Sequence, residues 1–144
     1  MCLALVLSFT AVEAIALDEI NTPWYSNVAI EGHDPVGYFL QNAAVKGSKA
    51  HKLKWNGVEW HFYSADNKAL FESDPEKYAP QYGGYCAWAA SQNQVAGVDP
   101  EQFSLIDGKL YLNYDEEVKN RWMLNTTKNI ADADKNWPGL LANE

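Results

Sequence analysis

The residues best suited to chemistry form one short segment, YGGYCAW at 82–88. Its two adjacent glycines allow a sharp turn and leave room for another group to approach. Cys86 follows at the start of a predicted short helix, where the dipole and free N–H groups favour a thiolate. Tyr82, Tyr85 and Trp88 can wall a pocket and supply polar groups. The segment predicts a ligand pocket, although free cysteine is also a common small core residue.

A second candidate cluster is GHDPV at 32–36. His33 can act as a ligand or base near neutral pH, and Asp34 can cap a helix or orient a neighbour. Asp34 before Pro35 is equally a plain turn former. Cys86 and His33 are the only evident soft and borderline metal donors, so any transition metal ion would use them. The candidate ligand-binding residues are therefore His33, Asp34, Tyr82, Tyr85, Cys86 and Trp88.

The common catalytic motifs are absent from the sequence. It contains no Walker loop, dinucleotide-binding glycine fingerprint, Cys-x-x-Cys pair or His-Glu-x-x-His motif. These absences argue against an ordinary hydrolase, dehydrogenase or zinc enzyme, and no catalytic residue is assigned.

Two β-hairpins are expected to position these clusters. Asn56-Gly57 and Asp107-Gly108 each separate two alternating apolar runs, which predicts two-residue type I′ turns. His61 is then expected on the polar, exposed side of the first hairpin. The predicted cross-strand pairs are Trp55 with Val58, Lys54 with Glu59, Leu53 with Trp60, His51 with Phe62, Leu105 with Leu110, and Phe103 with Leu112, with Tyr114 on the same apolar face as Leu112.

Short helices are expected around the hairpins, which gives an α+β fold: a small antiparallel sheet built from two hairpins with short helices packed around it. Residues 17–27 form an extended lead-in with Trp24 and Tyr25 docked on the domain. A strand is predicted at 28–30, followed by a helix that Ser64 caps and that buries Leu70 and Phe71. A turn is predicted at Asp74-Pro75, a helix at 87–90, and a capping box of Asn113 with Glu116. The last helix is predicted to begin at Thr126 or Thr127, to include Ile130, Ala133 and Trp137, and to end at Pro138-Gly139.

Composition limits the partners. The 144-residue chain is 47% hydrophobic, which suits one domain with a single core. Its formal net charge of -8 disfavours nucleic acid and anionic membrane surfaces, which would repel it. A small molecule, a metal ion or a protein partner remains.

The first 16 residues differ from the rest. They are largely apolar, carry Glu13 as their only charge and end in Ala14-Ile15-Ala16, a small-x-small pattern suited to signal peptidase. The apolar run is too short to span a bilayer. We expect a signal peptide at 1–16, a single domain at 17–144 with no transmembrane segment, and export to the periplasm or a similar compartment. The run lacks the usual early Lys or Arg, and the alternative is an apolar helix docked on the domain.

The order of motifs resembles the YHS domain, a small module often tied to metal handling. The resemblance rests on Asp34-Pro35-Val36, on Phe62 and Ser64, and on Phe71 with the segment DPEKY at 74–78. In metal-linked members, cysteines follow the Asp-Pro-Val and lie within and after the aromatic strand. Here those positions hold Gly37, Tyr63 and Asn67. The resemblance therefore implies the domain without its three-cysteine metal site.

Three functions remain open at this point. The first is an exported, non-catalytic domain that binds a small ligand or metal near Cys86, His33 and the tyrosines. The second is an enzyme with Cys86 as nucleophile and His33 as base. The third is a pure protein-interaction module, which an exposed aromatic patch would indicate.

Overall fold

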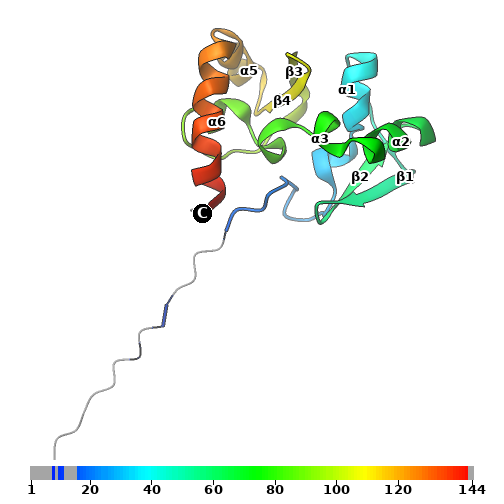
Figure 1. Ribbon diagram of the computed structural model, residues 1–144, viewed down its shortest axis with the longest axis horizontal. Coiled ribbons are helices and arrows are strands. Elements are labelled where there is room, and N and C mark those ends of the chain that lie inside the picture. Colours follow the sequence, from blue (N-terminus) through cyan, green and yellow to red (C-terminus); the bar gives the residue numbers. More distant parts are fainter. Residues whose placement is uncertain (1–7, 9, 12–15, 143–144) are drawn as a thin grey trace, which may run out of the picture.

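The computed structural model describes residues 8, 10–11 and 16–142, so most of the predicted signal peptide lies outside it. Two antiparallel hairpins and short helices confirm the predicted α+β class (Figure 1). Each hairpin forms a two-stranded sheet of its own. The elements in chain order are η1 (Ala29–Gly32), α1 (Pro35–Gln41), β1 (Ser48–Trp55), β2 (Val58–Phe62), α2 (Ala65–Ser73), α3 (Pro75–Tyr78), η2 (Gln81–Gly84), α4 (Ala87–Ser91), β3 (Asp99–Ile106), β4 (Lys109–Asn113), α5 (Glu116–Met123) and α6 (Thr126–Ala142).

Both type I′ turns are confirmed, with positive φ at Asn56, Gly57, Asp107 and Gly108. Most of the predicted pairing is confirmed as well, including Lys54 opposite Glu59 and both pairs of the second hairpin. The pairing of His51 with Phe62 is wrong, because β1 bulges between Ser48 and Lys52 and places Ser48 opposite Phe62. A bulge inserts residues that the simple alternation cannot count.

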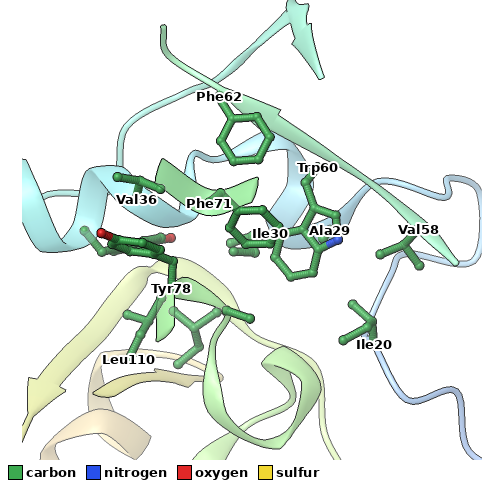
Figure 2. Close-up of a cluster of buried hydrophobic side chains, with 13 residues drawn as sticks. Ile20, Ala29, Ile30, Val36, Val58, Trp60, Phe62, Phe71, Tyr78 and Leu110 are labelled. Carbon is green, nitrogen blue, oxygen red and sulfur yellow. The ribbon is translucent and has the colours of Figure 1, made fainter. Parts of the chain in front are cut away.

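The first hydrophobic cluster gathers around β2 and α2. Figure 2 shows the rings of Trp60, Phe62 and Phe71 at its centre, and all three side chains are fully buried. The ring centroids of Trp60 and Phe62 lie 5.1 and 5.2 Å from that of Phe71. The indole N–H of Trp60 donates to the carbonyl of Trp55 at 3.0 Å, so this large ring is buried without an unpaired donor.

Strand β4 joins this cluster to a second one. Leu110 and Leu112 pack into the first cluster, whereas Tyr111 belongs to the second, with Trp122 of α5 and Ala133 of α6. Because successive side chains point to opposite faces of a strand, β4 is buried on both sides. Figure 1 shows this arrangement, with β1, β2, α1 and α2 on one side and α4, α5 and α6 on the other.

Several helix boundaries follow the sequence. The Ser64 hydroxyl accepts from Asn67 N at 3.1 Å and caps α2, and Phe71 of that helix is buried as predicted. Leu70 is 37% exposed, so its predicted burial is wrong. The predicted stop at Pro138 is also wrong, because α6 continues through it to Ala142.

Two further predictions, both for residues 24–30, are wrong. The expected strand at 28–30 is a single bridge at Val28 followed by the turn η1, in which Ile30 and Glu31 have φ of 52° and 51°. The lead-in aromatics do not dock, because Trp24 is 95% exposed and Tyr25 is 68% exposed. None of the helices in the described part of the chain has the length and apolar character needed to cross a membrane.

The turn at Gly57 gives a stability prediction. Gly57 has φ of +79° and no atom within 4 Å of where a Cβ would sit, so Gly57→Ala isolates the backbone penalty. We expect this variant to lose about 1 kcal/mol of unfolding free energy. The control is Gly97→Ala, since Gly97 has the same open space without a positive φ. Equal denaturant midpoints for the two variants would contradict the assigned turn.

Candidate functional site

Asp34 lies at the centre of a buried hydrogen-bond network. Its side chain is fully buried, and Oδ1 accepts from Val36 N at 2.8 Å and Gly37 N at 3.3 Å at the start of α1. Oδ2 accepts from Tyr63 N at 2.8 Å and from Asn67 Nδ2 at 2.7 Å. Four N–H donors therefore balance the carboxylate, and no cation of the described residues pairs with it.

The same network tests whether the family's metal fits. Gly37, Tyr63 and Asn67 stand where metal-linked members have cysteines, and all three donate hydrogen bonds to Asp34. None of the three has a thiol: Gly37 and Tyr63 donate through the backbone, and Asn67 donates through its side-chain amide. Both carboxylate oxygens of Asp34 already accept hydrogen bonds. In the described ranges, no three His, Cys, Asp or Glu side chains are grouped closely enough to hold a metal ion. The residues present do not fit a three-thiolate metal site.

His33 is placed by the turn before α1. Its side chain is buried, and Nδ1 lies 2.9 Å from the carbonyl oxygen of Ile30. The backbone of His33 forms an isolated antiparallel β-bridge with Lys46. Within residues 16–142, no hydrogen bond connects His33 or Asp34 with Cys86.

Tyr82 and Tyr85 lie around the glycine turn and contact the same ring, with centroids 5.9 and 5.7 Å from that of Trp137. The hydroxyl of Tyr82 donates to Asp134 Oδ1 at 2.8 Å, and that of Tyr85 donates to the carbonyl of Asp18 at 2.9 Å. Burial raises the pKa of both phenols, so they remain protonated donors.

The group that approaches the glycine turn is the chain's own lead-in segment. A Cβ on Gly83 would lie 1.9 Å from the carbonyl oxygen of Glu19, which only glycine permits. Asn21 fastens the segment there, because its backbone N donates to Gly83 O at 2.8 Å and its Nδ2 donates to Gly84 O at 3.2 Å. The lead-in segment therefore takes the close approach at Gly83, and both glycines also line a cavity of about 210 Å³.

Cys86 and Trp88 share a small pocket of about 240 Å³ at the start of α4. Tyr114 and Val118 also line it. Cys86 is 1% exposed, whereas Tyr114 is 58% exposed. The exposure of Tyr114 corrects its predicted place on the apolar face of β4, because the strand ends at Asn113. The full lining is Cys86, Trp88, Ala89, Gln92, Gln94, Ala96, Tyr114 and Val118.

Asn113 supports this pocket, although the sequence indicated only a helix cap. Its Oδ1 accepts from Trp88 N at 3.0 Å and from the Cys86 thiol at 3.6 Å. The cap of α5 is instead Asp115, whose Oδ1 accepts from Val118 N at 2.8 Å. Asn113 Nδ2 is buried and has no hydrogen-bond partner among the described residues. The only sequence signal for this role is a polar residue that ends an apolar strand.

The ionisation expected for Cys86 is wrong. Burial raises the pKa of the thiol, and the backbone N–H groups around it lower the pKa by less. Helix α4 has only five residues, so its dipole is small. Cys86 is therefore a protonated thiol that donates to Asn113.

The network around Asp34 gives a second prediction. Asp34→Ala leaves the part-buried Tyr63 N and the buried Asn67 Nδ2 without their acceptor, so we expect a loss of about 3 kcal/mol in unfolding free energy. Asp74→Ala is the matched control, because Asp74 precedes α3 without a side-chain cap. Chemical denaturation should place this control within about 0.5 kcal/mol of the parent protein. Similar losses in both variants would contradict the role of Asp34.

Comparisons with known proteins agree with the order of motifs. Residues 36–82 match the family model described as the YHS domain. Searches of curated proteins and of solved structures each gave no match. The matched range includes Gly37, Tyr63 and Asn67, the positions that surround Asp34. The chain therefore contains a YHS domain, matched over residues 36–82.

Proposed function

We propose that this protein is an exported, non-catalytic binding domain that holds a small, mostly apolar molecule in the pocket beside Cys86 and Trp88. The observation that carries the proposal is the lining of this pocket, where apolar residues such as Trp88 and Val118 lie beside the polar groups of Gln92 and Gln94. Small-molecule sites in proteins combine such walls with a few fixed polar contacts. The volume of about 240 Å³ suits a fragment-sized ligand.

The state of Cys86 favours binding over catalysis. A cysteine nucleophile needs a thiolate and a base within hydrogen-bond reach. Burial raises the pKa of Cys86, and its thiol donates to Asn113. His33, the base that a cysteine enzyme would use, lies instead against the carbonyl of Ile30. Cys86 then serves as a polarisable wall of the pocket.

A fragment screen tests this proposal. We expect fragments that bind to shift the backbone amide signals of Trp88 and Ala89 in NMR spectra of the full chain. Tyr114→Ala should weaken their affinity about tenfold, because it removes one wall of the pocket. Tyr63→Ala is the matched control, since Tyr63 is 59% exposed and lies outside this pocket. Its fragment affinities should equal those of the parent protein.

Two outcomes of the screen count against the proposal. If no fragment shifts these amides, or if both tyrosine variants weaken binding equally, the pocket is not the ligand site. The interaction-module alternative would then gain support, because Trp24 and Tyr25 form an exposed pair with ring centroids 5.5 Å apart.

The reactivity of Cys86 gives an independent prediction. Because burial raises the pKa of the thiol, the native protein contains less thiolate near neutral pH than the unfolded chain. We expect alkylation of the Cys86 peptide by iodoacetamide, read by mass spectrometry, to be slower in native than in denatured protein at pH 7. The native rate should rise as the pH increases towards 9. A native rate at pH 7 that matches the denatured rate would show an exposed, ionised thiol.

Export is supported by the apolar character of residues 1–16 and by Ala14-Ile15-Ala16. We expect protein recovered from the periplasm of a Gram-negative host to begin at or near Leu17, as measured by intact mass. Ala14→Arg should block this processing, because signal peptidase requires a small residue at that position. A periplasmic product that retains Met1 would refute cleavage.

A further inference from the structure

His61 forms a pair with Glu59 that the hairpin pattern does not predict. The sequence placed His61 on an exposed face, but its residue is only 6% exposed. His61 Nε2 lies 2.7 Å from Glu59 Oε2, and Glu59 Oε1 lies 3.4 Å from Lys52 Nζ. The hydrogen bond to His61 is the main cause that lowers the pKa of Glu59, so the carboxylate accepts and Nε2 donates.

The other ring nitrogen of His61 has a different environment. A Cβ on Gly32 would lie 3.3 Å from His61 Nδ1, so this nitrogen faces the bare Cα of a glycine. Nδ1 has no hydrogen-bond partner in the part of the chain that the structure describes. Gly32, Gly47 and His61 together form one wall of a cavity of about 490 Å³. This cavity shares no residue with the pocket beside Cys86.

The charges around this cavity differ in sign from the protein as a whole. The chain has a formal net charge of -8, yet four of its 11 Lys and Arg residues lie between residues 46 and 54. Lys46 and Lys49 line the cavity, and Glu31 is its only acidic lining residue. Lys46 Nζ donates to the carbonyl of Glu31 at 3.1 Å, which holds the ammonium group at the rim. Such a local excess of cations attracts anions and repels metal ions.

We propose that this cavity binds a small oxyanion, with Lys46 and Lys49 supplying charge and His61 Nδ1 supplying a directed hydrogen bond. In the imidazolium form of the ring, Nδ1–H donates to the oxyanion, while Nε2–H donates to Glu59 on the opposite side. A carboxylate and a phosphate share this chemistry. The site goes beyond the proposed function, because it uses another cavity and another class of ligand.

The test is an NMR titration of the full chain with inorganic phosphate and, separately, with succinate at constant ionic strength. We expect saturable shifts of the Gly32 and Gly47 amides, together with a change of the His61 imidazole ¹⁵N signals towards those of the protonated ring. Lys49→Gln and Lys46→Gln should each weaken the affinity about threefold. Lys54→Gln is the matched control, because Lys54 is on the same strand but does not line the cavity.

Each outcome decides the proposal. Saturation by phosphate, by succinate or by both supports it and shows which of the two anions the cavity accepts. Shifts that do not saturate overturn it. An equal loss of affinity in Lys54→Gln and Lys49→Gln also overturns it, since it shows only general attraction to a basic strand. The imidazole ¹⁵N signals of the parent protein report on His61 directly, so the test needs no substitution of this residue.

Discussion

The carboxylate of Asp34 is the interaction on which the YHS part of the structure depends. It is fully buried, and its four hydrogen bonds connect the start of α1, the end of β2 and α2. A buried charge is tolerated only when donors replace the lost water, so these elements must meet in one geometry. Gly37 and Tyr63 donate to the Asp34 carboxylate through their backbone N–H groups, and Asn67 donates through its side-chain amide.

A second constraint joins this part to the remainder of the protein. Strand β4 places Leu110 and Leu112 in one hydrophobic cluster and Tyr111 in the other. The lead-in segment adds to this connection, because Asn21 bonds to both glycines of the turn η2. The clusters cannot separate without exposing β4, so the residues that follow position 82 belong to the same folded unit as the matched YHS region.

The two cavities of interest differ in chemical character, which follows from their positions. The pocket beside Cys86 lies between α4 and α5 and has mostly apolar walls, with a thiol that burial keeps protonated. The cavity beside His61 lies against the basic strand β1 and has lysines at its rim. An apolar wall selects by shape and area, whereas lysines select by charge. The linings of the two cavities therefore favour different classes of small molecule.

Local signals in the sequence determined much of the architecture. Asn56-Gly57 and Asp107-Gly108 specified both hairpins and most of their register, because type I′ turns need residues that tolerate positive φ. Ser64 likewise specified the start of α2. The tertiary structure alone decided that His61 is buried against Glu59 and that Asn113 holds Cys86 rather than capping a helix. These roles depend on contacts with residues that are not neighbours in the strand pattern, and the spacing of residues along one strand does not predict such contacts.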